Sequence, residues 1–414
     1  MKPPRRGGRG LGACATLALL QAAPAAAAEC DAAFDALPRI GRVRGPDGAV
    51  HYVRVLAQEA GAPVRVAPIA PSGADLAEVV AAAAAPGETT LAWEIPPDEA
   101  ASRICAPFAL TQAEIDAEQR VVVAAGLNYA AHAEEAGGGE SFLFPKPVAP
   151  TPPYGVVSPP EGVVLLDYEV ELGFVLLEDI ALDALPSEEE LLERSAFFVA
   201  NDVTDREPII AMAKLAGVSD GFVEAKGQPG FLPAGPWLVH GPELGRALFA
   251  CGREGLGLRL EVDEGEGFAT RQDATTDLML EEPLALLQHI AREVEAHGLR
   301  TAMPVRRDGE LRHYPLAVDA EAPRLPAGSV ILTGTPDGIA LDTPDAAGLV
   351  LRGLLRLRSP FEQFRREQRA RVESGEAGGF LAPGDRVRAA IDGLGAQTVR
   401  IAASGIPNPD PCAP

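Results

Sequence analysis

The sequence predicts a mostly β protein with some helices, an α+β fold built from many short strands. Of the 414 residues, 43 are glycine and 38 are proline, and aromatic residues make up only 5%, a composition typical of a chain with many turns. Short apolar runs lie between these turn residues, as strands require. Residues 284–295 are the clearest predicted helix, with apolar residues at helical spacing.

Residues 29–118 are predicted to form a small N-terminal cap domain. Segments 40–43 and 51–56 are predicted strands on either side of a Pro-Asp-Gly turn at 46–48. The alanine-rich segment 75–85 is a predicted helix, and residues 111–119 are a predicted linker helix.

Residues 119–408 are predicted to form a larger second domain. Its predicted strands cover residues 121–125, 165–172, 237–239, 256–262, 329–332, 385–391 and 397–402. Segments 297–324 and 342–379 are interpreted as insertions. The second insertion includes an arginine-rich run, 352–371, which predicts an amphipathic helix with a solvated face or a subunit contact.

The N-terminus has the layout of a secretory signal peptide, predicted to cover residues 1–28. Four basic residues come first, Lys2, Arg5, Arg6 and Arg9, followed by a mostly apolar stretch at 11–23 and small residues at 25–28. The apolar stretch is too short for a comfortable membrane span. The prediction is therefore an exported protein, periplasmic or secreted, with no stable membrane anchor.

Five cysteines are present, and cleavage after residue 28 would remove Cys14. The four that remain are Cys30, Cys105, Cys251 and Cys412. In an oxidising compartment they would form up to two disulfides, with three pairings open. One of these joins Cys30 to Cys412 and would staple the two ends of the mature chain.

The formal net charge of −23 argues against two classes of partner. Nucleic acids are bound through clustered lysine and arginine, and anionic membranes attract basic segments. The sequence therefore predicts neither partner.

A group of carboxylates is the strongest chemical feature of the chain. Asp167, Glu169 and Glu171 alternate with apolar residues, so on one strand they would share a face, and Asp202 ends another apolar run. Such a face is often merely solvated. If the carboxylates are buried together, however, a hard divalent cation such as Mg²⁺, Mn²⁺ or Ca²⁺ would relieve their repulsion.

Seven motifs occur in an order that resembles one enzyme family. They are GLNYAAHAEE (126–135), FPKP (144–147), DYEVEL (167–172), NDVTDRE (201–207), Lys226 before PAGPW (233–237), GTPDGI (334–339) and FLAPGD (380–385). Over residues 119–405 the chain resembles the fumarylacetoacetate hydrolase (FAH) family, with its acylpyruvate hydrolase, oxaloacetate decarboxylase and hydroxy-heptadienedioate isomerase branches. The resemblance implies a mixed β-roll catalytic domain, a homodimer, a Mg²⁺ or Mn²⁺ site, and small dicarbonyl or oxo-acid substrates.

The resemblance also assigns roles to individual residues. Glu169, Glu171 and Asp202 match the metal ligands of the family, while Asp167 would be at most a hydrogen-bonding partner. His132 and Glu135 match a His–Glu pair in which the carboxylate orients the imidazole and the imidazole deprotonates water.

Four further residues are candidates on weaker grounds. Lys226 would stabilise developing negative charge as a catalytic residue. Arg206 would contact substrate or brace the site, and Thr335 and Lys146 would contact substrate. A plain salt bridge from Arg206 to Asp205 or Glu207 and a turn role for Thr335 are the simpler interpretations. Two departures from the family pattern stand out. Gly227-Gln228-Pro229 follows Lys226 where the family has Ser-Phe-Asp, and Ile209 stands where some members have glutamine.

The resulting hypothesis is a divalent-metal-dependent hydrolase that cleaves a carbon–carbon bond in a β-dicarbonyl or acylpyruvate-type acid. An oxo-acid decarboxylase or a tautomerase could use the same metal site. The two departures also leave open an exported metal- or acid-binding protein without turnover, because a fold does not fix a function.

Overall fold

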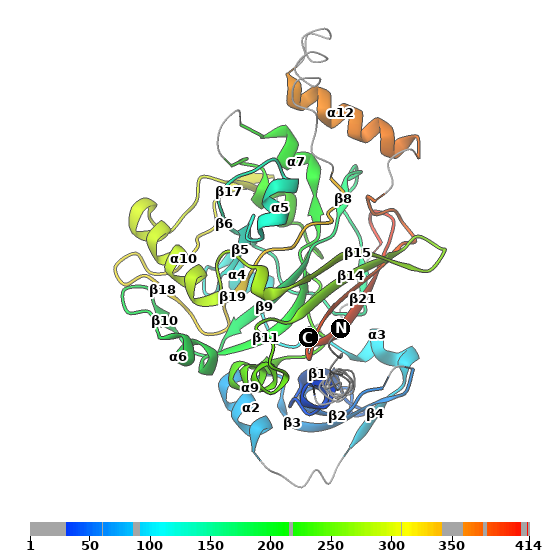
Figure 1. The fold of residues 1–414 in the computed structure, drawn as a ribbon, viewed down its shortest axis with the longest axis vertical. Helices are drawn as coiled ribbons and strands as arrows, with labels where there is room; N and C mark the ends of the chain where they lie inside the picture. The colour runs from blue at the N-terminus through cyan, green and yellow to red at the C-terminus, as the bar shows by residue number, and fades with distance from the viewer. Residues whose placement is uncertain are drawn as a thin grey trace, which may run out of the picture.

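The computed structural model describes residues 30–59, 61–85, 92–214, 218–307, 309–341, 359–375, 379–406 and 412. Figure 1 shows a four-stranded sheet at one end of the molecule, a larger region of sheets and helices above it, and helix α12 at the opposite end. The predicted α+β class is confirmed. Among the described residues, no helix is both long and apolar enough to cross a bilayer.

The N-terminal sheet is an antiparallel meander in the order β1-β2-β3-β4. Its strands are β1 (Ile40–Arg44), β2 (Val50–Ala57), β3 (Val64–Pro71) and β4 (Trp93–Ile95). The predicted turn joins β1 to β2, and Gly48 within it has a φ of 79°, which glycine adopts at little cost. The boundary near residue 118 stays a prediction, because one core cluster contains Ile40 and Tyr52 from this region together with Val122 and Val175 from the next.

A six-stranded mixed sheet forms the centre of the larger region, in the order β13-β11-β9-β19-β5-β6. The strands are β5 (Val122–Gly126), β6 (Phe142–Pro145), β9 (Val170–Leu176), β11 (Ser195–Asn201), β13 (Val239–His240) and β19 (Val330–Leu332). Every residue of β9 and β11 is buried. Their nearly continuous apolar character follows, since both faces of these strands are covered.

A five-stranded sheet with the order β15-β14-β20-β21-β7 contacts the six-stranded one through β9 and β11. It contains β7 (Val156–Val157), β14 (Gly257–Asp263), β15 (Phe268–Thr275), β20 (Arg386–Ile391) and β21 (Gly395–Ile401). Three two-stranded pairs complete the strands: β8 (Leu166–Asp167) with β12 (Thr204–Asp205), β10 (Ile180–Ala181) with β18 (Arg324–Leu325), and β16 (Val305–Arg307) with β17 (Glu310–Arg312).

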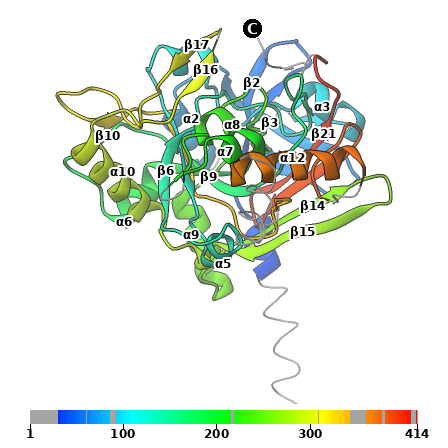
Figure 2. The ribbon, with the colours of Figure 1, turned by 90° about the horizontal axis from the view of Figure 1, so that it is seen from above.

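The helices lie around these sheets, as Figure 2 shows from above. They are α2 (Leu76–Ala84), α3 (Ala100–Arg103), α4 (Gln112–Asp116), α5 (Ala130–Glu135), α6 (Glu188–Glu193), α7 (Arg206–Ala211), α8 (Phe222–Lys226), α9 (Gly241–Cys251), α10 (Pro283–His297) and α12 (Pro360–Glu373), with 3₁₀ turns at Pro97–Glu99 and Thr276–Leu278. The helix predicted at 284–295 is α10, which begins with a proline in its first turn and buries Leu286, Leu287, Ile290 and Val294.

The strand predicted at 165–172 is wrong in one respect. It is interrupted at Tyr168 and Glu169, so that Asp167 belongs to β8 and Glu171 to β9, in different sheets. The alternation of apolar and acidic residues gave no sign of the break. Within the second predicted insertion, α12 contacts α7, and Arg369 of α12 forms an ion pair with Glu207 of α7. The predicted signal peptide, 1–28, and residues 352–358 of the arginine-rich run lie outside the described residues.

Two disulfides join the cysteines that signal-peptide cleavage would leave. Cys30 pairs with Cys251, and Cys105 pairs with Cys412. Each terminal cysteine is therefore tied to the interior of the sequence, and the pairing of Cys30 with Cys412 is not the one adopted. The enclosed loops, with sequence separations of 221 and 307, span most of the chain.

We expect removal of Cys30–Cys251 by the double substitution to serine to lower the free energy of unfolding by about 2–4 kcal/mol, because a cross-link over a long loop restricts the unfolded chain. Urea denaturation measures this. Peptide mapping without reductant should recover Cys30 with Cys251 and Cys105 with Cys412, and a Cys30–Cys412 peptide would contradict the pairing.

Candidate active site

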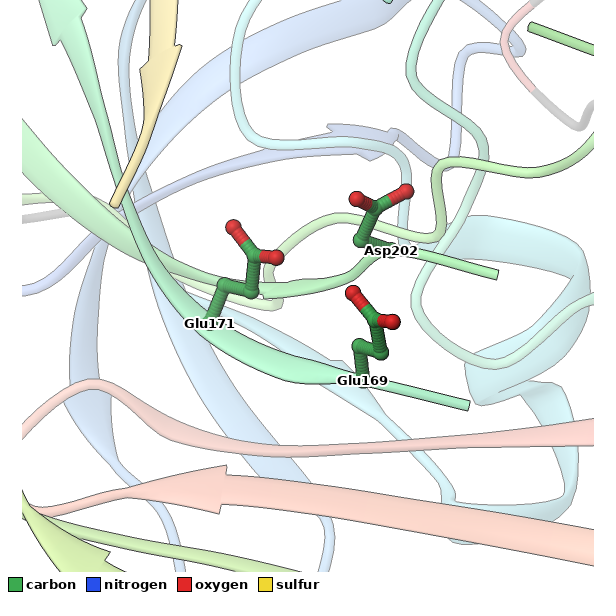
Figure 3. Close-up of side chains that lie close together, drawn as sticks. All are labelled: Glu169, Glu171 and Asp202. Atoms are coloured by element: carbon green, nitrogen blue, oxygen red, sulfur yellow. The ribbon is translucent and has the colours of Figure 1, made fainter. Parts of the chain in front are cut away.

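Three carboxylates meet at the end of the β9–β11 strand pair. Glu171 lies on β9 opposite Ala200, Glu169 directly precedes β9, and Asp202 directly follows β11. The Asp202 amide donates to the Glu169 carbonyl at 2.8 Å, which fixes the two backbones side by side. All three residues are buried, and one carboxylate oxygen of each lies within 4.8 Å of the others (Figure 3).

Three buried cations surround this triad. Lys226 Nζ, at the end of α8, lies 2.5 Å from Glu169 Oε2 and 2.7 Å from Asp202 Oδ2. Lys146 Nζ lies 2.5 Å from Asp202 Oδ1, and Arg206 Nη2 lies 2.6 Å from Glu169 Oε1. Buried charges are tolerated only when paired in this way. The candidates Lys146, Lys226 and Arg206 are thus brought together around the triad.

Asp167 is a fourth buried carboxylate, and it binds Arg206 and the backbone of Ala340 next to the triad. It accepts from Arg206 Nε at 2.8 Å and from the Ala340 amide at 3.0 Å. Arg206 therefore bridges Asp167 and Glu169 with one planar guanidinium, which suits bidentate recognition. The simpler sequence interpretation, a salt bridge from Arg206 to its neighbours Asp205 or Glu207, is not the arrangement found.

The ion pairs divide the triad electrostatically. Burial alone would raise the pKa of Glu169, but the adjacent Lys226 and Arg206 lower it to about 2. Burial, reinforced by the negative charge of Asp202, raises the pKa of Glu171 well above its ordinary value. The site's own cations therefore keep Glu169 ionised, whereas they leave the ionised form of Glu171 unfavourable.

The two lysines also differ from each other. Burial lowers the pKa of Lys146 even though Asp202 lies beside it. The pKa of Lys226 is raised, because Asp202 and Glu169 together outweigh the effect of burial. Lys146 lies fully buried behind Asp202 and also donates to the Lys226 carbonyl at 2.6 Å. This placement favours a role in holding the site, and the substrate contact predicted for Lys146 stays a prediction.

The triad fits a hard divalent cation. Glu171 Oε2 accepts from the Gly334 amide at 2.9 Å, while no hydrogen-bond donor in the described part of the chain reaches the buried Glu171 Oε1. A buried carboxylate oxygen without a partner is costly, and coordination of a cation would remove that cost. Three carboxylates that supply only oxygen atoms are the ligand set that Mg²⁺, Mn²⁺ and Ca²⁺ prefer.

The predicted His–Glu pair is present on α5. His132 Nδ1 lies 3.2 Å from Glu135 Oε2, the i,i+3 contact expected of one helical face. Glu135 also accepts from the Gly338 amide at 3.1 Å. Since a protonated His132 would lower the pKa of Glu169, the pair lies within electrostatic reach of the triad. The competing partner, Glu134, is not the residue that His132 contacts.

The segment 334–338 connects the triad to the His–Glu pair through its glycines. Gly334 and Gly338 have φ values of 88° and 98°, which residues with a side chain rarely adopt. A Cβ on Gly338 would lie 2.1 Å from the Arg271 carbonyl oxygen. Each glycine directs its amide at one active-site carboxylate, Gly334 at Glu171 and Gly338 at Glu135.

Thr335 lies between these glycines, and its hydroxyl is engaged by the protein. It donates to the Val170 carbonyl at 3.0 Å and accepts from Gln272 Nε2 at 2.9 Å. Gln272 in turn accepts from the Val170 amide at 2.9 Å. This hydroxyl therefore fixes the start of β9, and a contact between Thr335 and substrate stays a prediction.

Tyr129 and Gln272 are residues of the site that sequence reasoning missed. Tyr129 is buried, and its hydroxyl has no hydrogen-bond partner among the described residues. Burial and the charge of Glu171 raise its pKa. Tyr129 stands inside the first of the seven motifs, three residues before His132, so its position was a usable signal. Gln272 lies in no motif, and sequence alone offered no sign of it.

Residues 121–402 match the sequence profile described as fumarylacetoacetate (FAA) hydrolase C-terminal. A mitochondrial oxaloacetate tautomerase of Arabidopsis thaliana is 30% identical over 236 residues, which are 53% of this chain and 79% of that protein. A 2,4-didehydro-3-deoxy-L-rhamnonate hydrolase of a Sphingomonas species is 36% identical over 129 residues, which are 30% of this chain and 42% of that enzyme.

A 2-hydroxyhepta-2,4-diene-1,7-dioate isomerase from Mycobacterium marinum has a similar solved structure. It superposes with a TM-score of 0.52 at 20% identity, covering 89% of this chain and 100% of that one. At this identity the likeness concerns the fold alone. It extends beyond the profile match to most of the chain.

We expect Lys146→Met to lower the free energy of unfolding, measured with EDTA present, by about 3–5 kcal/mol, because it leaves Asp202 Oδ1 buried without its cation. Lys214→Met is the matched control, since that lysine pairs with Asp220 at the surface and should cost at most about 0.5 kcal/mol. Equal costs for the two variants would contradict the buried ion pair.

We expect Glu171→Gln to weaken Mn²⁺ binding by about 100-fold or more, whereas Glu135→Gln should change it only a few-fold, because Glu135 contacts His132 and Gly338 rather than the triad. Titration calorimetry on the metal-free protein measures both. Unchanged affinity in Glu171→Gln would rule out the triad as the metal site.

Proposed function

Because the chain belongs to the fumarylacetoacetate hydrolase family, we propose that it is a divalent-metal-dependent hydrolase that cleaves a carbon–carbon bond in a β-dicarbonyl acid of the acylpyruvate type. The observation that carries this choice is the His132–Glu135 pair beside the buried triad. Hydrolysis needs a base for water, and a histidine oriented by a carboxylate is such a base.

Glu169, Glu171 and Asp202 would hold the cation, with Mg²⁺ or Mn²⁺ preferred to Ca²⁺ because the site supplies three carboxylates and leaves positions for other oxygen ligands. When bound, it supplies Lewis acidity toward the two oxygens of a dicarbonyl unit. With all seven groups ionised, the buried carboxylates Asp167, Glu169, Glu171 and Asp202 outnumber the cations Lys146, Arg206 and Lys226 by one formal charge. A divalent cation reverses this balance and favours an anionic substrate.

The chain's own residues carry the proposed proton transfers. His132 takes a proton from water, and the water oxygen forms a bond to the carbonyl carbon distal to the substrate carboxylate. The carbon–carbon bond then breaks, and its electron pair passes to the methylene carbon as an enolate. The Lys226 ammonium, already held among carboxylates, stabilises that negative charge. The proton that His132 took from water then passes to the carbon and gives pyruvate, and the other product is a carboxylic acid.

Tautomerisation of an oxo acid, or its decarboxylation, is the second candidate. The Arabidopsis relative, named an oxaloacetate tautomerase, supports it, since 79% of that protein aligns with this chain. Neither reaction adds water to the product. The replacement of the family's glutamine by Ile209, and of Ser-Phe-Asp by Gly227-Gln228-Pro229, also fits a change of substrate within the same site.

The proposal also includes the cellular location and the oligomeric state of the protein. We propose that the protein acts in the periplasm or outside the cell, which two disulfides between Cys30, Cys105, Cys251 and Cys412 support, because such bonds persist in oxidising compartments. A homodimer is proposed from family resemblance, with small dicarbonyl or oxo acids as ligands. Light scattering of the purified protein tests the dimer.

Turnover of an acylpyruvate in H₂¹⁸O distinguishes the candidate reactions. We expect ¹⁸O in the carboxylic acid product, dependence on added Mn²⁺ or Mg²⁺, and a loss of kcat of about 10²–10⁴-fold in His132→Ala, because the base for water is gone. His313→Ala is the control, because His313 is exposed and lies far from His132 in the sequence, and it should keep the kcat of the wild-type protein.

Other outcomes would replace the proposal. Conversion of oxaloacetate between its enol and keto forms without ¹⁸O uptake would favour the tautomerase, and release of CO₂ the decarboxylase. Tight binding of these acids with no product would favour an exported binding protein.

A further inference from the structure

The first insertion reaches the back of the active site through one hairpin. Strands β16 and β17, near the top of Figure 2, belong to segment 297–324, and β16 contacts α8. Val305 is fully buried in the core cluster that also contains Val223 of α8. The Arg306 amide donates to Glu224 Oε2 at 2.5 Å. The hairpin is therefore fixed against the helix that ends at Lys226.

Arg307 joins the chain segments that follow the two active-site lysines. Its Nη2 donates to the Pro147 carbonyl at 2.6 Å and to the Gly227 carbonyl at 2.5 Å. Pro147 directly follows Lys146, and Gly227 directly follows Lys226. Lys146 Nζ also donates to the Lys226 carbonyl. These three hydrogen bonds, together with the peptide links from Lys146 to Pro147 and from Lys226 to Gly227, form a closed ring that includes both lysines and Arg307.

Local structure holds only part of the end of α8. Helix α8 has only five residues, and within its own segment the Gly227 amide donates to the Val223 carbonyl and Gln228 Nε2 donates to the Glu224 carbonyl at 2.9 Å. The carbonyls of Lys226 and Gly227 accept instead from Lys146 and Arg307, which come from other parts of the chain. A guanidinium at this helix end supplies charge-assisted hydrogen bonds that the helix cannot make for itself.

We propose that Arg307 is a positioning residue that aligns Lys146 and Lys226 with the carboxylates Glu169 and Asp202, so that this insertion is part of the active-site scaffold. The proposal deepens the proposed function, since it concerns the same site. Its first test needs no turnover and therefore stands even if the proposed reaction is wrong.

The test uses the small number of lysines in this chain, which are Lys2, Lys146, Lys214 and Lys226. Reductive methylation with formaldehyde and borohydride, followed by mass spectrometry, gives a labelling rate for each. Lys146 and Lys226 are buried and should label slowly, whereas the Lys214 side chain is 47% exposed and serves as the internal reference.

We expect Arg307→Ala to raise the labelling rates of Lys146 and Lys226, relative to Lys214, by about 10-fold, because losing hydrogen bonds to a charged group favours local opening by that factor or more. Arg306→Ala is the matched control on the same hairpin. Its side chain is exposed and donates to Gly309 of the hairpin itself, and the substitution keeps the amide bond to Glu224. In this control, Lys146 and Lys226 should be labelled at the same rates as in the wild-type protein.

Arg307→Lys retains a cation near the two carbonyls and should label at an intermediate rate. It also covers the case in which Arg307→Ala does not fold. Where the protein turns over a dicarbonyl acid, Arg307→Ala should lower kcat by about 10-fold or more while KM changes by at most about 3-fold, since Lys226 stabilises developing charge. Lysine protection and kcat that stay unchanged in both Arg307 variants would overturn the proposal.

Discussion

The structure depends on burying charge in its central region without leaving it unpaired. Asp167, Glu169, Glu171 and Asp202 are nearly inaccessible to solvent, and so are Lys146, Arg206 and Lys226. Each such group would cost several kcal/mol if buried alone, so the chain must deliver cations and carboxylates to one place from distant segments. That requirement explains why β6, α7 and α8 all approach the end of the β9–β11 pair. Among these seven charged groups, only Glu171 has a buried polar atom, Oε1, that no donor in the described residues reaches.

The segment 334–340 gives the site its second level of organisation. Gly334 donates to Glu171, Gly338 to Glu135, and Ala340 to Asp167. One stretch of backbone therefore sets the distance between the triad and the His132–Glu135 pair. Because the backbone has positive φ at positions 334 and 338 and a Cβ on Gly338 would clash with the Arg271 carbonyl, glycine is required at both positions by geometry and close approach. The positions of Glu171 and Glu135 thus depend on two glycines that have no side chain to take part in chemistry.

The sequence identified the residues of this site more completely than it identified the contacts between them. The motifs located Glu169, Glu171, Asp202, His132 and Glu135, and the helix face for His132 and Glu135 followed from their spacing. The contacts of Asp167 and Arg206 with each other could not be predicted, because they join positions about forty residues apart and short-range patterns cannot show such contacts. The break at Tyr168 was hidden for the same reason, since β8 pairs with β12 rather than continuing into β9. Main strands such as β5, β14, β19 and β20 were predictable because their apolar runs are bounded by turns.

The insertions show how a site can survive local changes in its sequence. Where the family resemblance expects Ser-Phe-Asp, this chain has Gly227-Gln228-Pro229, which contacts the backbone of α8 through the Gly227 amide and the Gln228 side chain. Lys226 lies 2.5 Å from Glu169 and 2.7 Å from Asp202. Further constraint comes from outside the segment, and the described contacts give two sources, Lys146 from the FPKP motif and Arg307 from the β16–β17 hairpin. A segment interpreted from the sequence as an insertion is thus connected to Lys226, which contacts two members of the triad. Deleting the hairpin would remove the Arg307 contacts while leaving every motif residue in place.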